Sequence, residues 1–144
     1  MSGLTVLRAE EEWQRAGAYS VRIQGMNRQH GLSLREEFDE HDGDGTRYVV
    51  LLDGGYPVAT CRFYELDPAR VTLGRVVVLP EYRGKGIAPA LTNRLARAVL
   101  EREKVPFYCS AWSNIKSVRN ALRSGFRPAW TELTACVLPS ESKQ

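Results

Sequence analysis

The residues with the clearest chemical meaning form the segment Arg83-Gly84-Lys85-Gly86-Ile87-Ala88, directly after the most valine-rich stretch of the chain. The residues before it favour a strand, and the apolar spacing after it favours a helix. The first amides of a helix have no internal partner and carry partial positive charge. Glycines let a ligand approach the backbone closely, and Arg83 and Lys85 add full charges. The segment therefore predicts an anion site suited to a pyrophosphate.

Three phosphate-binding motifs can be compared with this segment. A P-loop requires GxxxxGK followed by Ser or Thr, and this stretch lacks the first glycine and the hydroxyl. A dinucleotide fingerprint requires GxGxxG, but Pro89 stands at the third glycine. The pattern Arg-x-x-Gly-x-(Gly/Ala) fits fully from Arg83 to Ala88. A glycine-containing loop between strand and helix, without a ligand, remains the alternative.

Charged residues are unevenly distributed, although the net charge is only +3. Six of the 17 acidic residues lie between positions 36 and 44. The stretch 113–131 holds Lys116, Arg119, Arg123 and Arg127 and no acid. Such a molecule would suit an anionic ligand at one place and a cationic one at another, or both clusters are solvated surface. Nucleic-acid binding is disfavoured, because the basic face lacks interleaved aromatic residues and the overall charge is low.

Metal, disulfide and membrane patterns are weak. Asp42-Gly43-Asp44-Gly45 suggests a calcium loop, but the matching twelfth position is Leu51 where a glutamate is required. Cys61, Cys109 and Cys136 are widely spaced, without a CxxC pair, so we expect no metal site and reduced thiols. With no secretory signal and no apolar run of about 18 residues, we expect a cytoplasmic protein without a membrane partner.

The elements that must position these residues follow from length and periodicity. The 144 residues, 43% of them apolar, predict one globular domain over 1–144. Strand-like and helix-like segments alternate, which predicts an α+β fold with a mixed sheet. Three consecutive valines at 76–78 suggest burial on both faces of their strand. The predicted strands are 4–8, 47–53, 57–65, 71–79, 105–112 and 130–138, and the predicted helices are 10–26, 33–38, 87–99 and 114–124.

Three segments in this order resemble one known family, the GNAT N-acetyltransferase superfamily. The stretch VVVLPEYRGKGIAPAL, residues 76–91, resembles its coenzyme A motif, and Asn114-x-x-Ser117 followed by Gly125-Phe126 resembles its second motif. Tyr19-Ser20-Val21-Arg22 with the acidic segment 37–42 resembles a bacterial branch of small members. The resemblance implies a GNAT-like twisted, mostly antiparallel mixed sheet flanked by helices, with splayed central strands forming the acyl-CoA cleft.

The resemblance also implies a cofactor and a reaction. Acetyl-CoA would place its pantetheine arm along Val76, Val77 and Val78, like an added strand. The backbone of residues 83–88 would wrap the pyrophosphate, and Asn114 would contact the pantetheine or nucleotide. The implied reaction is direct acetyl transfer to a primary amine of a small molecule or a protein. The acidic segment suggests a cationic acceptor, and a homodimer is a family expectation only.

The chain departs from the family pattern at the positions that usually move protons. A tyrosine acid often stands where this chain has Ala121, and a glutamate base often stands at the positions of Gly74 or Cys109. Glu37 and Asp39 are therefore the candidate bases, with solvated capping acids as the alternative interpretation. Tyr108, with Ser110, could assist the leaving thiolate or be an ordinary strand residue. A second hypothesis is a non-catalytic acyl-CoA-binding sensor or degenerate partner subunit.

Overall fold

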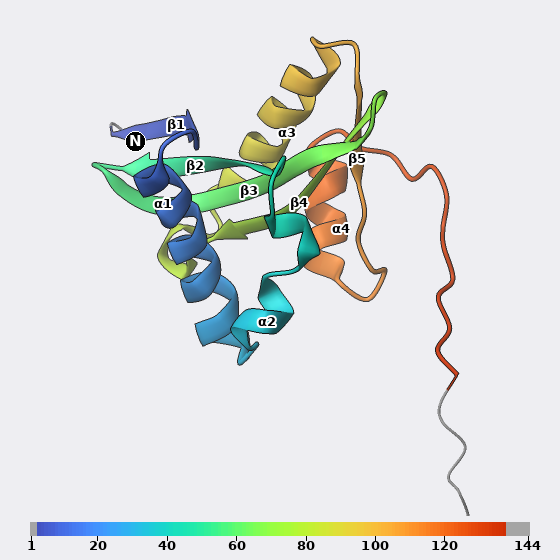
Figure 1. Cartoon of the computed structure of the whole chain (residues 1–144), viewed down its shortest axis with the longest axis horizontal. Coiled ribbons are helices and arrows are strands. Elements are labelled where there is room, and N and C mark those ends of the chain that lie inside the picture. Colours follow the sequence, from blue (N-terminus) through green and yellow to red (C-terminus); the bar gives the residue numbers. More distant parts are fainter. Residues whose placement is uncertain (1–2, 138–144) are drawn as a thin grey trace, which may run out of the picture.

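The computed structural model describes residues 3–137, in which a five-stranded sheet is flanked by helices (Figure 1). The first half of the chain forms β1 (Leu4–Arg8), α1 (Glu12–Arg22), the π-helix η1 (Ile23–Arg28), α2 (Leu34–Glu37), the 3-10 turn η2 (Glu40–Asp42), β2 (Arg47–Asp53) and β3 (Tyr56–Asp67). The second half forms β4 (Arg70–Val78), the 3-10 turn η3 (Pro80–Tyr82), α3 (Ile87–Leu100), β5 (Val105–Tyr108) and α4 (Ile115–Arg123).

The sheet is mixed and it splays at one place. Its order is β1-β2-β3-β4-β5, with antiparallel pairing from β1 to β4 and parallel pairing between β4 and β5. The parallel pairing joins Arg70–Leu73 to Val105–Tyr108 and ends there. The rest of β4, up to Val78, pairs with β3 on one side, and the residues described here provide no strand on the other. This confirms the predicted fold class, including the splayed central strands.

The two faces of the sheet bury separate apolar clusters. On the face covered by α3, Leu73 and Val78 pack in one cluster with Leu91 and Leu95. On the face covered by α1, Val77 packs with Val21 and Leu79. Val77 and Val78 are thus buried on opposite faces, as the three consecutive valines predicted. Each such burial contributes roughly 1.5–3 kcal/mol, so β4 is held firmly from both sides.

Two local features near the N-terminal helices follow from single residues. Ser33 caps α2: its hydroxyl accepts from the Glu36 amide at 3.3 Å, while Glu36 accepts from the Ser33 amide at 2.7 Å. This confirms the predicted capping box. The predicted helix 10–26 is α1 continued by the π-helix η1, where buried Gly25 lies against Val77 so closely that a Cβ would overlap its Cγ1.

The C-terminal part of the sheet differs from the prediction. The segment 130–138 was expected to be a strand, but its residues up to 137 form none, and Leu138 lies outside the described residues. The strand expected over 105–112 ends at Tyr108. Strand propensity forms a strand only where a partner edge is met, and Trp130 instead stacks on Phe107 with ring centroids 5.1 Å apart.

Helix α4 lies at the surface of the domain. Ile115 and Leu122 are both more than half exposed, and every residue of α4 keeps some exposure. The helix is tied to α3 chiefly by polar contacts, such as the amide of Asn93 donating to the Ser124 carbonyl at 2.9 Å. Within residues 3–137 every helix is too short or too polar to span a bilayer.

Candidate active site

The start of α3 presents a cradle of unpaired backbone donors. Gly84 and Gly86 have φ angles of +73° and +75°, a left-handed conformation that glycine adopts without strain. Within residues 3–137, the amides of Gly84, Lys85, Gly86, Ile87 and Ala88 donate no hydrogen bond. Five free amides at a helix N-terminus fit a pyrophosphate, so the residues present match the cofactor expected from the sequence.

Side chains of the cradle fix its position and leave its backbone free. Arg83 Nε donates to the Val78 carbonyl at 2.9 Å, and its Nη1 donates to Gln29 Oε1 at 2.7 Å. Arg83 thereby ties the loop to the end of β4 and to the residue after η1. The ammonium of Lys85 lies 5.2 Å from the ring centroid of Tyr82, whose hydroxyl donates to Asp53 at 2.6 Å. Both cations stay beside the cradle and add positive potential.

The open part of β4 lies between this cradle and a pocket. Val78 and Val77 pair with Ala59 and Thr60 of β3, which leaves the opposite strand edge beyond Leu73 open to an extended, amide-bearing ligand. Asn114 stands at the N-terminus of α4, the helix that follows β5, and its Oδ1 accepts from the Ser117 amide at 3.2 Å. Its side chain is therefore a helix cap.

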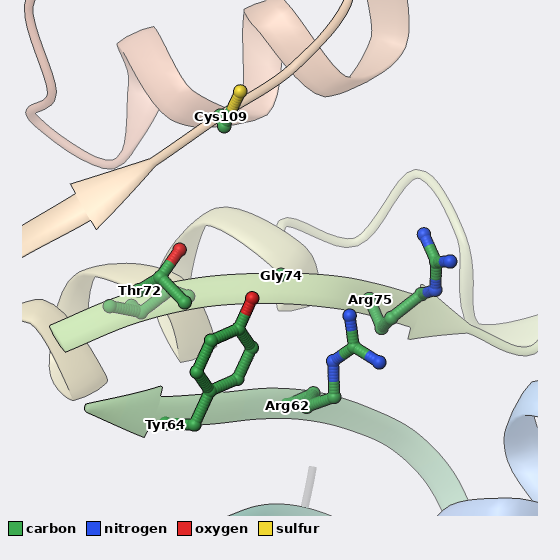
Figure 2. Close-up of a pocket in the computed structure, with 7 residues that line it drawn as sticks. Arg62, Tyr64, Thr72, Gly74, Arg75 and Cys109 are labelled. Atoms are coloured by element: carbon green, nitrogen blue, oxygen red, sulfur yellow. The ribbon is translucent and has the colours of Figure 1, made fainter. Parts of the chain in front are cut away.

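A pocket of about 170 Å³ opens between β3, β4 and the chain just after β5 (Figure 2). The register pairs Arg62 with Gly74 and Tyr64 with Thr72, so these residues share one face of the two strands. Figure 2 shows the hydroxyls of Tyr64 and Thr72 directed toward the segment that carries Cys109. The residues lining the pocket are Arg62, Tyr64, Thr72, Leu73, Gly74, Arg75 and Cys109.

Gly74 and Cys109, the two positions where the family pattern often has a glutamate, both line this pocket. A Cβ at Gly74 would meet no atom within 4 Å, so the missing side chain leaves open space. The pocket lining contains no carboxylate and two guanidinium groups. At the positions where the family pattern often has a glutamate base, this chain therefore has an open cavity.

The acidic residues expected to supply the base are engaged elsewhere. Glu37 has a side chain only 2% exposed, and its Oε1 accepts from Arg22 Nε at 2.9 Å. Asp42 accepts from Arg22 at 2.5 Å, from Arg62 at 3.0 Å and from the hydroxyl of Tyr48 at 2.6 Å. The fully buried Arg22 thus joins both carboxylates, which serve as its counter-ions.

Asp39 completes this ion network. Its carboxylate lies 2.7 Å from Arg62 and 3.2 Å from Arg75. Burial by itself would raise the pKa of Asp39, but the hydrogen bond and the charge of Arg62 outweigh it and hold the pKa below its ordinary value. A carboxylate stabilised in its charged form is a weak base. Glu37 and Asp39, the bases expected from the sequence, do not line the pocket, and both are paired with arginines.

The hydroxyl of Tyr108 contacts side chains of α4. It is 2.9 Å from Ser117 Oγ and 3.4 Å from Asn120 Nδ2, both on α4. Ser117 precedes Ala121 by one helical turn, so the Tyr108 hydroxyl reaches the helix that carries the usual position of the acid.

Four polar or charged residues of the pocket lining were not singled out from the sequence: Arg62, Tyr64, Thr72 and Arg75. Arg62 and Tyr64 alternate along β3, and this spacing of two was a usable signal for a shared face. Arg75 offered no such signal. It has a φ of +48° beside a register shift between β3 and β4, so a bulge directs its side chain toward Asp39.

Residues 8–126 match the acetyltransferase (GNAT) family, and the chain belongs to that family. The matched region contains the whole cradle, the open part of β4 and the pocket. Among residues 3–137, no cluster of three or more His, Cys, Asp or Glu side chains could hold a metal ion.

Several solved structures share the fold. The aminoglycoside N-acetyltransferase AAC(6')-Iy, solved with CoA, has a TM-score of 0.70 at 14% identity, with 95% of this chain and 96% of that chain covered. A ribosomal-protein-alanine N-acetyltransferase from Brucella melitensis gives 0.68 at 17% identity, covering 94% and 99%. An acetyltransferase from Clostridium acetobutylicum, described as predicted and solved with acetyl-CoA, gives 0.66 at 15% identity, covering 91% and 96%. Acetyl-CoA, the cofactor expected from the sequence, is thus one that such folds bind.

Proposed function

We propose that this protein transfers the acetyl group of acetyl-CoA directly to a primary amine. The observation that carries this proposal is the cradle of five unpaired amides at the start of α3, which lies at one end of the open part of β4. Bound acetyl-CoA supplies the acetyl group as a thioester, whose C–S bond breaks as the new C–N bond forms. The amides of residues 84–88 bind its pyrophosphate, and Val76, Val77 and Val78 align its extended arm.

The proton steps are assigned to Tyr108 and to water. Tyr108, held by Ser117 at 2.9 Å, gives a proton to the leaving sulfur. The pocket lining has no carboxylate, so water carries the proton away from the amine. Positioning of the two reactants then supplies most of the rate enhancement, and proximity alone contributes several kcal/mol. Glu37 and Asp39 act indirectly by holding Arg62 and Arg75 at the pocket.

The binding step is tested by thermal unfolding with acetyl-CoA, free CoA and ATP as separate ligands. A ligand at about a hundred times its Kd adds about 2.7 kcal/mol. For a domain of this size, the midpoint should rise by roughly 5–10 °C. Both CoA species should produce this shift, and ATP should not.

A matched pair of glycine variants locates the site. Gly86→Ala places a methyl group among the free amides, whereas Gly54→Ala changes a hairpin glycine that also has positive φ and open space around it. Both variants carry similar backbone strain, of about 1 kcal/mol. Gly86→Ala should lose the CoA shift and Gly54→Ala should keep it. If Gly86→Ala keeps the CoA-induced shift in the thermal midpoint, the cradle does not bind the pyrophosphate.

A second candidate function is acyl-CoA binding without turnover. The absence of a carboxylate from the pocket lining, together with Ala121 at the usual position of the acid, favours it. Release of free CoA thiol in the presence of a panel of amines separates the two. Turnover above the rate without protein supports the transferase, and a CoA shift without any turnover supports the sensor.

A further inference from the structure

We propose that the acceptor amine carries a carboxylate, and that Arg75 with the hydroxyls of Tyr64 and Thr72 binds it. This inference rests on the proposed acetyl transfer and names the substrate class of the same site. It departs from the cationic acceptor that the acidic segment suggested from the sequence. The argument follows from which charged groups line the pocket and which stand behind it.

Three of the six acids that suggested a cationic acceptor are already paired with arginines, and the other three, Glu36, Glu40 and Asp44, are exposed outside the pocket lining. Glu37 and Asp42 have side chains 2% and 8% exposed, and both are paired with Arg22. Asp39 is paired with Arg62 and Arg75. The three carboxylates therefore balance three guanidinium groups. An ammonium group entering the pocket would meet arginines in its lining and no carboxylate.

The pocket lining instead presents donors that lack acceptors. Arg75 is 34% exposed and uses its Nε and Nη2 on Glu37 and Asp39, while its Nη1 donates no hydrogen bond within residues 3–137. In the same part of the chain the hydroxyls of Tyr64 and Thr72 have no hydrogen-bond partner. Burial raises the pKa of Tyr64, so its hydroxyl keeps its proton. An ionised carboxylate, which only accepts hydrogen bonds, complements these donors.

Size and rigidity agree with a small anionic group. The pocket volume of about 170 Å³ is about the volume that five or six water molecules occupy in liquid water. Arg62 is almost fully buried, and its guanidinium lies 5.6 Å from the ring centroid of Tyr64. The same ring stacks with the His41 ring, with centroids 4.7 Å apart. The donors are thus held in place before the acceptor binds, which reduces the ordering cost of binding.

The test compares amines that differ by one carboxylate, with acetyl-CoA as donor. Suitable pairs are L-lysine and cadaverine, L-ornithine and putrescine, and L-phenylalanine and phenethylamine. We expect kcat/KM to be at least tenfold higher for the carboxylate-bearing member of any pair that is acetylated. A decarboxylated member that is acetylated equally well or better would overturn the inference and leave the proposed transferase function standing.

Variants assign the effect to Arg75. Arg75→Gln should reduce kcat/KM for the carboxylate-bearing amine at least tenfold and change that of its decarboxylated partner less than twofold. Arg75→Lys, which keeps a charge, should retain part of the preference. Arg70→Gln is the control, because Arg70 lies on the same strand and pairs with Asp67 outside the pocket. Equal losses in Arg75→Gln for both members of a pair would show a structural role only and would refute the inference.

A separate binding measurement covers the case without turnover. Equilibrium dialysis of the same radiolabelled pairs is then done with the protein saturated by free CoA. Tighter binding of the carboxylate-bearing members, lost in Arg75→Gln, would support the inference although the transferase proposal had failed. Binding of neither member, or equal binding of both, would refute it.

Discussion

Replacing Asp42 by asparagine tests the ion network that holds the pocket. Asp42 accepts hydrogen bonds from Arg22, Arg62, Tyr48 and the amide of Asp39, and its side chain is only 8% exposed. The variant keeps an acceptor oxygen but leaves buried guanidinium groups without one of their three counter-ions. Removing one partner of a buried ion pair costs about 3–5 kcal/mol. Because asparagine keeps part of the hydrogen bonding, we expect a loss of about 3 kcal/mol.

Urea unfolding at pH 7 measures this loss. The transition midpoint should fall by about 1–2 M in urea, and the thermal midpoint by roughly 10 °C. Asp44→Asn is the matched control, because it makes the same chemical change at an exposed residue two positions along the chain. It should change the free energy of unfolding by less than about 0.5 kcal/mol.

The stability difference between wild type and Asp42→Asn should depend on pH. Burial by itself would raise the pKa of Asp42, but hydrogen bonds from Arg22 and Tyr48 outweigh it and hold the pKa well below its ordinary value. A depressed pKa stabilises the folded protein above the unfolded-state pKa, near 4, and this stabilisation is lost as the pH falls toward the folded-state pKa. The gap between wild type and Asp42→Asn should therefore narrow below about pH 4. Equal midpoints of Asp42→Asn and Asp44→Asn at pH 7 would refute the reasoning.

Three further predictions concern β4 and the thiols. Gly25→Ala should lower the free energy of unfolding by about 1–3 kcal/mol, measured in urea, because its methyl group would displace Val77 of β4. It should also weaken CoA binding if β4 aligns the pantetheine arm as proposed. Unchanged stability would contradict the packing. Burial raises the pKa of Cys61 to about 12, so in the native protein a thiol reagent at pH 8 should modify exposed Cys109 and Cys136 and spare Cys61. In the Cys136→Ser variant, carboxymethylation should modify Cys109 and reduce acetyl transfer several-fold, because the added carboxymethyl group places an anion in the pocket. Full activity after complete modification would show that the acceptor does not use this pocket.

The parts predicted correctly from the sequence depend on local chemistry. Left-handed glycines at 84 and 86 followed by apolar helical spacing define the cradle within about ten residues of chain, and Ser33 with Glu36 define a cap within four. Neither depends on a distant partner. The paired valines of β4 were also predictable, because burial on both faces leaves a continuous apolar run in the sequence.

Other features depend on partners that a local pattern does not identify. Glu37 ends α2 and Asp39 follows two residues later, and their sequence neighbourhood is the same whether they face solvent or an arginine. Arg22 lies 15 residues before Glu37, and Arg62 lies 23 residues after Asp39. The segment 130–137 has strand-like composition, but a strand also requires an edge to pair with, and Trp130 packs on Phe107 instead. The homodimer and the cytoplasmic location stay predictions.

The ion network gives a physical reason for finding the Tyr19-x-Val21-Arg22 segment and the acidic segment in one chain. Tyr19 packs edge-on against Phe38 at 5.2 Å, and the Arg22 guanidinium lies 4.2 Å from the centroid of the same ring. Arg22 then binds Glu37, whose carbonyl also accepts from Arg75 Nε at 3.3 Å. The two segments therefore form one scaffold, and this scaffold holds the Arg75 guanidinium at the pocket. Glu37 and Asp39 therefore hold the Arg75 guanidinium at the pocket and do not themselves bind a cation. A pocket that presents this guanidinium favours an acceptor that carries a negative charge.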